Sequence, residues 1–307
     1  DADSFGAAIG IYRAAKTLNK KAYIVIDNPT SSIIPLMNTF SDNQDYEADM
    51  FVNNHEAKEI MDDNTLLVVV DTNKPSITQC EDLLYMAKMI VVLDHHRQGS
   101  DTIRNSVLSY IEPYASSASE MVAEILQYFT EGIRIRNVEA DSIYAGIMID
   151  TDNFMQKTGV RTFEAAAFLR RCGADVTRVR KLFREDMNDY KARGETIRNA
   201  ELFRGQFAIS ECPSDHVDSP TVVGAQAANE LLNIVGVKAS FVLTEYKGVI
   251  YISARAIDEV NVQIIMERMG GGGHLNMAGC QLETVDLEGA RSLLKSTLTE
   301  MQDGGEI

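Results

Sequence analysis

The sequence predicts an α/β fold, with a parallel sheet in an N-terminal domain and a smaller α/β domain after it. Two short apolar runs, Leu66–Asp71 (LLVVVD) and Ile90–His96 (IVVLDHH), support the parallel sheet. Runs of β-branched residues without polar alternation are typical of strands buried on both faces of such a sheet. A helical pattern separates the two runs, and this β-α-β order predicts right-handed crossovers. After about Gly205 alternating strands appear, which indicates a second domain.

The length of 307 residues suits two hydrophobic cores rather than one. We expect a metal-binding domain at residues 1–185, a polar helical connector at 186–204 and a ligand-binding domain at 205–307. The composition, 45% hydrophobic and 24% charged, is that of a soluble globular protein.

The elements expected in the N-terminal domain follow from local pattern and propensity. In chain order they are an Ala-rich helix at Ala7–Ala15, a strand at Lys21–Asp27, surface connections with a short helix at 32–37 and 42–49, the strand Leu66–Asp71, a helix at Thr78–Met89 and the strand Ile90–Asp94. The order of these elements places the two carboxylate-ended strands side by side.

Later helices are indicated by their capping signals. Ser117 and Glu120 fit the capping-box pattern ahead of an apolar helix. Ala140–Met148 is expected to be a helix or a buried segment that leads to Asp150. Thr162 is expected to cap a helix that runs to Arg171 and stops at Gly173.

The second domain is expected to combine strands and helices. Phe207–Ser210 and Phe241–Glu245 are expected strands, and Val249–Arg255 alternates as a half-buried strand does. Thr221–Ile234 is expected to be a helix.

Charge and cysteine usage exclude several classes. The net charge of −16 disfavours a long nucleic-acid groove, which needs clustered Lys and Arg, although bound metal ions could still attract a small anion. The four cysteines are far apart, so they indicate neither a zinc site nor a disulfide framework but thiols in a reducing cytoplasm. No apolar run approaches the roughly 20 residues that span a bilayer.

Acidic residues and histidines gather at the expected ends of apolar segments. Asp3 lies in a leading loop, and Asp71, His95 and Asp150 are expected to end strands, with Asp1 nearby. One such residue is ordinarily a cap or a turn residue. Several at one sheet edge favour a bound divalent metal, because carboxylates with an imidazole suit Mn²⁺ or Mg²⁺.

A glycine run marks the second domain. A single glycine after a helix is a C-cap, but Gly270, Gly271, Gly272 and Gly273 in succession exceed that need. Their N–H groups could approach a phosphate closely, although no Walker motif follows. His274 could bond the same anion, and Arg255 is either a phosphate partner or an ordinary surface arginine.

These motifs together resemble a known family. They are the Asp-X-Asp of Asp1 to Asp3, VVVDTN at 68–73, LDHHR at 93–97, MIDTDNF at 148–154 and GGGGH at 270–274. In this order they resemble the DHH phosphoesterase superfamily with its DHH-associated C-terminal domain, over essentially the whole chain. YIEPYASSASE, FREDMNDYKAR and ISARAIDEVNVQIIMERMGGGGH resemble more narrowly the GdpP-type cyclic di-AMP phosphodiesterases.

The resemblance implies two Mn²⁺ ions, with Mg²⁺ or Co²⁺ as alternatives. One would be held by Asp3, Asp71, His95 and Asp150. The other would be held by Asp1, Asp71 and a histidine four residues before Asp1, which lies outside this sequence. We therefore expect the natural protein to extend upstream with a strand ending in that histidine, and the Asp1-side ion to bind weakly without it.

The implied activity is hydrolysis of cyclic di-AMP to the linear dinucleotide pApA. Asp71 would bridge the two ions, and a hydroxide activated by both would attack phosphorus in line. His96 would contact the phosphate and help to protonate the leaving 3′-oxygen. Gly270 to Gly273, His274 and Arg255 would hold the second phosphate or the base.

Other functions stay open at this stage. One alternative is an oligoribonuclease or pAp phosphatase acting on very short RNA, and another is a catalytically impaired sensor of cyclic dinucleotides. We expect a small cyclic dinucleotide as the partner and no long nucleic acid, and we leave a homodimer open. The chain as given is expected in the cytoplasm, with membrane and sensor domains upstream in the intact protein left open.

Overall fold

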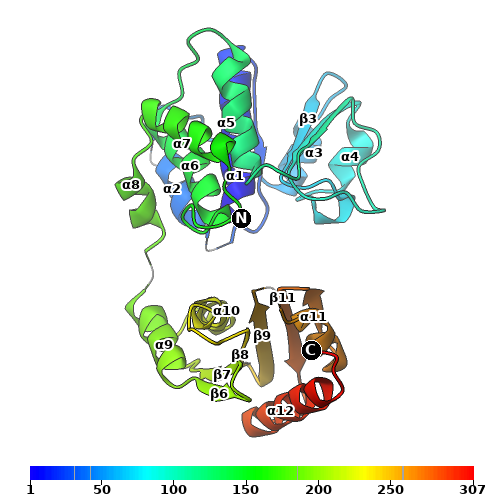
Figure 1. Cartoon of the computed structure of the whole chain (residues 1–307). Helices are drawn as coiled ribbons and strands as arrows, with labels where there is room; N and C mark the ends of the chain where they lie inside the picture. Colours follow the sequence, from blue (N-terminus) through cyan, green and yellow to red (C-terminus); the bar gives the residue numbers. More distant parts are fainter. Residues whose placement is uncertain (31, 42, 185, 258) are drawn as a thin grey trace. The chain divides into compact units, whose positions relative to one another are not determined.

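The computed structural model describes residues 1–30, 32–41, 43–184, 186–257 and 259–307. The chain forms two compact units, Asp1–Arg184 and Glu185–Ile307 (Figure 1). Within the described ranges, the helices lack the combined length and apolar character that crossing a membrane requires.

The first unit combines helices with short parallel strands. In chain order its elements are α1 (Ala2–Thr17), β1 (Ile24–Val25), α2 (Ile34–Ser41), β2 (Phe51–Val52), α3 (Asn54–Ile60), β3 (Leu66–Val70), a 3₁₀ turn at Pro75–Ile77, α4 (Asp82–Met86), β4 (Met89–Asp94), β5 (Leu108–Ile111), α5 (Ala118–Phe129), α6 (Asn137–Asp150), α7 (Val160–Arg171) and α8 (Val176–Leu182). The α/β class predicted from the sequence is confirmed.

The predicted parallel pairing is confirmed, but the strands form two sheets. β3, β4 and β5 pair in parallel in that order, and β1 pairs in parallel with β2. The expected strand Lys21–Asp27 is therefore too long, because only Ile24 and Val25 form ladder pairs.

Burial differs between the two apolar strands. The central strand β4 has Ile90 and Val92 on one face and Leu93 on the other, all within hydrophobic cores. β3 lies at the edge of its sheet, and its first residue, Leu66, is 51% exposed. Full burial on both faces therefore holds for most of β4 and not for β3.

Two expected helices differ from the structure. The helix predicted at Thr78–Met89 is confined to α4, and Met89 already belongs to β4. The cap of α7 is Gly159 rather than Thr162, whose hydroxyl accepts a hydrogen bond from the Gly159 N–H at 3.0 Å. Thr162 thus supplies the reciprocal half of a cap that begins three residues earlier, and the predicted stop at Gly173 has a left-handed φ of 102°.

Glycines let α1, α5 and α6 pack closely. A Cβ on Gly6 would lie 2.6 Å from the Ser142 carbonyl oxygen of α6, and one on Gly146 would lie 2.2 Å from Ser119 Oγ of α5. A Cβ on Gly10 would lie 2.3 Å from Val122 Cγ1. These contacts leave no room for a side chain, so the glycines determine how closely α1 packs on the other two helices.

The second unit is a six-stranded mixed sheet covered on both faces. Its elements are α9 (Met187–Arg198), β6 (Glu201–Phe203), β7 (Phe207–Cys212), α10 (Pro220–Leu231), β8 (Ala239–Tyr246), β9 (Val249–Ala256), α11 (Val262–Arg268), β10 (Gly272–His274), β11 (Met277–Leu282) and α12 (Leu287–Asp303). The strand order is β10-β11-β9-β8-β7-β6, and only the β7–β8 pair is parallel.

Two hydrophobic cores define the layers of this unit. Residues of α11 and α12 pack on one face of the sheet, and residues of α9 and α10 pack on the other (Figure 1). The residues of the expected connector, 186–204, include α9 and β6. Ala192 of α9 is buried against α10, and the Ser210 hydroxyl of β7 donates to the Thr196 carbonyl of α9.

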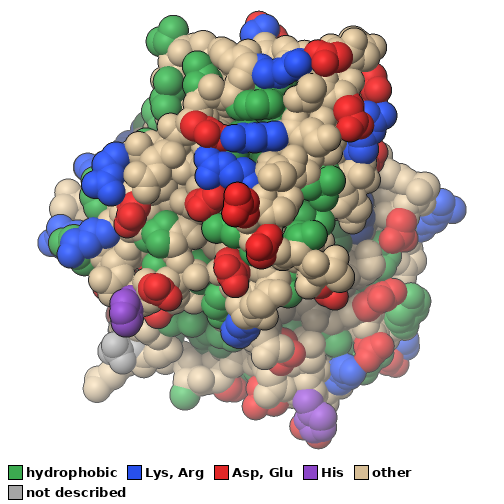
Figure 2. Space-filling view, turned by 90° about the horizontal axis from the view of Figure 1, so that it is seen from below, with side chains coloured by type: hydrophobic (Ala, Val, Ile, Leu, Met, Phe, Trp, Pro, Cys, Tyr) green, Lys and Arg blue, Asp and Glu red, His purple; other side chains and the backbone are tan. Residues whose placement is uncertain are grey.

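Acidic and basic side chains are interspersed on the face that Figure 2 shows. In the second unit Arg291 lies between two glutamates, 3.1 Å from Glu201 and 2.7 Å from Glu211, and Arg204 lies 2.6 Å from Asp303. The Arg291 pairs are half-buried, whereas Asp303 in the Arg204 pair is exposed, and ion pairs open to solvent contribute little to stability. They do neutralise these guanidinium groups locally.

Candidate functional site

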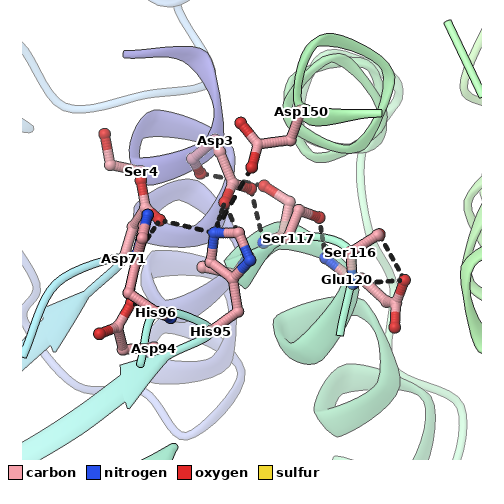
Figure 3. A network of polar contacts seen from close by, with 12 residues as sticks. Asp3, Ser4, Asp71, Asp94, His95, His96, Ser116, Ser117, Glu120 and Asp150 are labelled. Atoms are coloured by element: carbon pink, nitrogen blue, oxygen red, sulfur yellow. Dashed lines mark hydrogen bonds and ion pairs between the residues drawn. The ribbon is translucent and has the colours of Figure 1, made fainter. Parts of the chain in front are cut away.

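Three carboxylates from separate elements converge on one imidazole nitrogen. His95 Nε2 lies 3.3 Å from Asp71 Oδ1, 3.4 Å from Asp150 Oδ2 and 3.7 Å from Asp3 Oδ2. Figure 3 shows the carboxylates pointing toward the ring of His95. The structure therefore brings together four of the five residues predicted as metal ligands. We call this group the His95 cluster.

The elements that supply the His95 cluster differ in part from the expectation. Asp71 directly follows β3 and His95 directly follows β4, as predicted. Asp150 is the last residue of α6, however, and Asp3 lies in the first turn of α1, so neither ends a strand or occupies a loop. Helix α6 is buried almost all round, so its sequence lacks the one-sided apolar period that identifies a surface helix.

The carboxylate of Asp3 is held by the first turn of α5. Its Oδ2 accepts the Ala118 N–H at 2.7 Å and its Oδ1 accepts the Ser119 N–H at 2.8 Å. The residue is 1% exposed. Unsatisfied N–H groups at a helix start favour an anion, so this contact stabilises the charge and fixes the orientation of the carboxylate.

The predicted capping box at the same helix start is only half formed. The Ser117 hydroxyl accepts the Glu120 N–H at 3.0 Å, as a cap does. The Glu120 carboxylate instead accepts the N–H and the hydroxyl of Ser116. This leaves the N–H groups of Ala118 and Ser119 to Asp3, a role that capping statistics do not reveal.

Asp150 is followed by a strained turn. Asp152, Asn153 and Phe154 have φ angles of 46°, 58° and 66°, a left-handed conformation that costs non-glycine residues roughly 1 kcal/mol or more each. The Asn153 N–H donates to the Met148 carbonyl at 2.7 Å, and the Phe154 ring centroid lies 5.5 Å from that of Tyr144. These contacts hold the turn and end α6 at Asp150.

His96 is oriented by Asp94, a residue for which the sequence predicts no role. Its Nδ1 lies 2.8 Å from Asp94 Oδ1, and the other oxygen of Asp94 accepts a hydrogen bond from the Asn73 amide. Burial alone would raise the pKa of Asp94, but the bonds from His96 and Asn73 outweigh it and hold that pKa below its usual value. The same bond to Asp94 raises the pKa of His96. Asn73 lies two residues after Asp71 in the VVVDTN motif, and this position in the motif is the one sequence signal that could have predicted its place in the site.

The electrostatics of the His95 cluster favour proton or cation binding. Burial would lower the pKa of His95, but the surrounding Asp71, Asp3 and Asp150 raise it to about 9. Burial raises the pKa of Asp71 to about 6, and attraction to His95 only partly offsets this. Burial and the charge of Asp3 also raise the pKa of Asp150. Crowded carboxylates hold protons in this way when no other cation is present.

The donor set fits a divalent metal. His95 Nε2 and Asp71 Oδ1 are buried, and neither has a hydrogen-bond partner among the residues that the structure describes. Buried polar atoms are almost always partnered, so two unpartnered atoms that face each other fit a site for a bound cation. Oxygen donors with one imidazole suit Mn²⁺ or Mg²⁺. In the described part of the chain two groups could hold an ion: Asp3, His95 and Asp150, and Asp71, His95 and His96.

Asp1, the fifth predicted ligand, is the N-cap of α1 in this structure. Its Oδ1 accepts the N–H groups of Asp3 and Ser4, both at 3.0 Å. It belongs to neither of the two groups found among the described residues.

Backbone geometry requires glycine at three of the four positions of the glycine run. Gly270 follows Met269, the C-cap of α11, and has a φ of 86°, and Gly273 has a φ of 149°. A Cβ on Gly271 would lie 2.1 Å from the Gly279 carbonyl oxygen, so this residue is excluded from bearing a side chain by the approach of β11. A Cβ on Gly272 would meet no atom of the described chain within 4 Å. We expected four successive glycines to exceed what a helix C-cap requires. Backbone geometry nevertheless accounts for all of them except Gly272.

Arg255 and His274 lie in one row across the sheet. Met277 of β11 pairs with His274 on one side and with Arg255 on the other. Arg255 is half-buried, which lowers the pKa of its guanidinium, and its Nη1 donates to the Ala254 carbonyl at 2.9 Å. Its Nε is buried without a partner in the described residues, while His274 is exposed.

Comparisons with known proteins agree with this architecture. The DHH family, N-terminal domain, matches residues 1–147, and the DHHA1 domain matches residues 205–300. Cyclic-di-AMP phosphodiesterase GdpP of Bacillus subtilis (strain 168) is 42% identical over 99% of this chain and 47% of its own length. Cyclic-di-AMP phosphodiesterase PdeA of Listeria monocytogenes is 38% identical over 97% of this chain and 46% of its own. The chain thus spans about half the length of the curated relatives it matches.

A solved structure shares the fold. An exopolyphosphatase-related protein from Bacteroides fragilis aligns with a TM-score of 0.80 at 20% identity, covering 99% of this chain and 90% of its own. The fold and the His95 cluster define a two-unit α/β protein with a carboxylate–imidazole centre suited to divalent metal. The chain belongs to the DHH family, with its N-terminal domain followed by a DHHA1 domain.

Proposed function

We propose that this chain is the catalytic part of a metal-dependent phosphodiesterase that opens cyclic di-AMP to linear pApA. The observation that carries the proposal is the His95 cluster, in which three carboxylates surround a buried imidazole nitrogen without a hydrogen-bond partner among the described residues. The names of the GdpP and PdeA relatives support the choice of substrate.

Mn²⁺ would be held by Asp3, Asp71, His95 and Asp150, with Mg²⁺ or Co²⁺ as alternatives. We keep Asp71 as the shared ligand of a second ion, with Asp1 as a further ligand. A divalent ion bound there supplies a Lewis acid for the phosphoryl oxygens and lowers the pKa of bound water.

The chain's own residues position the substrate and move a proton. The α5 N–H groups keep the Asp3 carboxylate turned into the cluster. Asp94 holds His96 through Nδ1, and its charge favours the imidazolium. His96 is 60% exposed at its side chain, so it can contact the phosphate and donate a proton to the leaving 3′-oxygen.

The second unit would bind the remainder of the nucleotide. Gly270, Gly271, Gly272 and Gly273 with His274 and Arg255 are our candidates for holding the second phosphate or the base. Gly272 contributes open backbone, and Arg255 contributes a buried Nε that no described residue partners. Guanidinium groups pair well with phosphate.

The direct test is to incubate the purified chain with Mn²⁺ and a panel of cyclic di-AMP, cyclic di-GMP, pApA and short RNA. Chromatography should show metal-dependent conversion of cyclic di-AMP to pApA. Mononucleotide release from short RNA or pApA would favour the oligoribonuclease or pAp phosphatase alternative. Tight binding of cyclic di-AMP without turnover would favour the impaired sensor.

A further inference from the structure

A hollow of about 530 Å³ lies on the second unit, and all of its lining residues belong to that unit. Helix α10 packs on β7, β8 and β9, and Gly224 lets it sit directly on Thr244 of β8. The hollow lies beside the start of α10, over β9 and β11. Its lining includes Thr221 of α10, residues of both strands and the turn at Gly270 and Gly271.

The register of β9 and β11 determines the shape of the hollow. Ser253 pairs with Gly279, and Tyr251 pairs with Gln281 two residues further along the strands, on the same face of the sheet. Residues that pair directly share a face of the sheet. Two small residues therefore form a low floor, and a phenol and an amide stand together at one end.

The lining has an unusual chemistry for this chain. The residues that line the hollow are all uncharged, within the part of the chain that the structure describes, although 24% of the sequence is charged. A phosphate placed there would lose water without meeting a cation, which is costly. A planar, neutral, hydrogen-bonding group would meet the Tyr251 ring, the hydroxyls of Thr221 and Ser253, and the amide of Gln281. The volume is within the range of small-molecule sites.

We propose that this hollow holds an adenine base of the cyclic dinucleotide, and that Gln281 determines the preference for adenine over guanine. The inference rests on the proposed function for its substrate class and extends it to a named specificity residue. A glutamine amide presents one donor and one acceptor side by side, which match N7 and the N6 amino group of adenine. Guanine presents two acceptors, O6 and N7, at the same edge, so the Gln281 carbonyl would face an acceptor. Tyr251 supplies a ring on which the base can stack.

The test compares kcat/KM for cyclic di-AMP and cyclic di-GMP in the wild type, Gln281→Ala and Gln281→Arg. Gln263→Ala is the matched control, because the side chain of this half-buried glutamine of α11 donates a hydrogen bond to Glu267 of the same helix and does not line the hollow. Gln281→Ala should reduce the preference for cyclic di-AMP about tenfold through KM, with kcat and Mn²⁺ affinity unchanged. Gln281→Arg should shift the preference toward cyclic di-GMP, since arginine pairs with guanine O6 and N7.

The outcomes separate this inference from the proposed function. If the wild type hydrolyses cyclic di-AMP and both Gln281 variants keep its preference, the base site is wrong and the activity stands. If the wild type hydrolyses neither dinucleotide, the proposed function fails, and dissociation constants for the two dinucleotides then provide the same comparison. Equal affinity of the wild type for both, or binding of neither, would overturn the role of Gln281.

Discussion

The His95 cluster and the hollow on the second unit differ in their charge. The cluster gathers three carboxylates and an imidazole with little solvent contact: Asp3 is 1% exposed and His95 is 9% exposed. The hollow is lined by uncharged residues, with Ser253 and Gly279 at its floor and Tyr251 and Gln281 at one end. The proposed catalytic site is thus rich in charge. The proposed site that prefers adenine over guanine is neutral, and there the pattern of hydrogen-bond donors and acceptors would determine the preference.

The two regions also differ in what holds them. Residues outside the cluster hold its proposed ligands: the α5 N–H groups bind Asp3, and a strained turn follows Asp150. In the second unit, close approach of β11 to the glycine run sets the geometry. Active centres commonly contain such locally unfavourable features, which the surrounding fold must stabilise.

The largest effect should follow from removing the shared carboxylate. Asp71→Ala should lower turnover by about a thousandfold, the upper part of the range for one electrostatic group. The fold should persist, and the metal-free protein should become no less stable, because burial already raises the pKa of Asp71 to about 6. Steady-state kinetics and thermal unfolding measure both effects. Asp63→Ala, which removes an exposed carboxylate paired with Lys88, is the control. Near-normal activity in Asp71→Ala would refute the two-metal interpretation.

The sequence predicted which residues meet better than it predicted how they are held. Asp71 and His95 could be placed because buried parallel strands end at one edge. For Asp150 the sequence leaves a helix or a strand open before it, because a helix buried all round gives no amphipathic period. The anchoring of Asp3 joins residues 115 positions apart, and no local pattern contains that information.

The glycine run and the N-terminal aspartates show a second limit. Capping and metal ligation require the same residue types at a helix start, so the sequence could not separate the role of Asp1 from that of Asp3. Likewise, glycine is required both for close backbone contact and for open access. Only the positions of neighbouring atoms distinguish Gly271 from Gly272.

The next largest effect concerns pH, because protons and metal compete for the cluster. His95 has a pKa of about 9 without metal, so an ion that needs the neutral imidazole must displace a proton below that pH. Mn²⁺ affinity should therefore fall by up to about tenfold per pH unit as the pH is lowered from 9 to 7. Calorimetric titration in buffers of different ionisation enthalpy would measure the released proton. Affinity independent of pH in this interval would contradict the assignment of His95 as a ligand.

The same groups determine how the free energy of unfolding of the metal-free protein changes with pH. The raised pKa of His95 stabilises the folded state fully below about 6.5, and this contribution is lost as the pH rises to about 9. Asp71 binds its proton more tightly when folded, so its ionisation between about pH 4 and 6 is destabilising. Chemical denaturation of the metal-free protein should therefore show these two contributions decreasing with rising pH. Added Mn²⁺ should reverse the loss, since it binds the deprotonated folded state.

A smaller effect tests the helix crossing behind the cluster. Gly146→Ala places a Cβ 2.2 Å from Ser119 Oγ and 3.0 Å from Asp3 Cα, so it should destabilise the protein by about 2 kcal/mol and weaken Mn²⁺ binding. Gly194→Ala is the matched control: it lies in helix α9, and a Cβ there meets no described atom within 4 Å. That variant should gain about 0.5–1 kcal/mol through helix propensity. Equal unfolding temperatures for the two variants would show that the crossing is not tight.

The smallest effect tests whether the glycine run of the second unit lets the nucleotide approach or serves only as a structural turn. Gly272→Val should leave the free energy of unfolding within about 0.5 kcal/mol of the wild type, because the added side chain has open space. It should leave Mn²⁺ affinity unchanged, since the proposed ligands lie in the first unit, and should raise KM for cyclic di-AMP by about fivefold, near 1 kcal/mol. Gly271→Val should instead destabilise the second unit, because its Cβ would lie 2.1 Å from the Gly279 carbonyl oxygen and 2.4 Å from Cys280 Cβ. A change in KM with Gly271→Val would therefore mix damage to the sheet with loss of access, and only Gly272→Val isolates access. If Gly272→Val keeps the wild-type KM, the run is a structural turn and the nucleotide does not approach it.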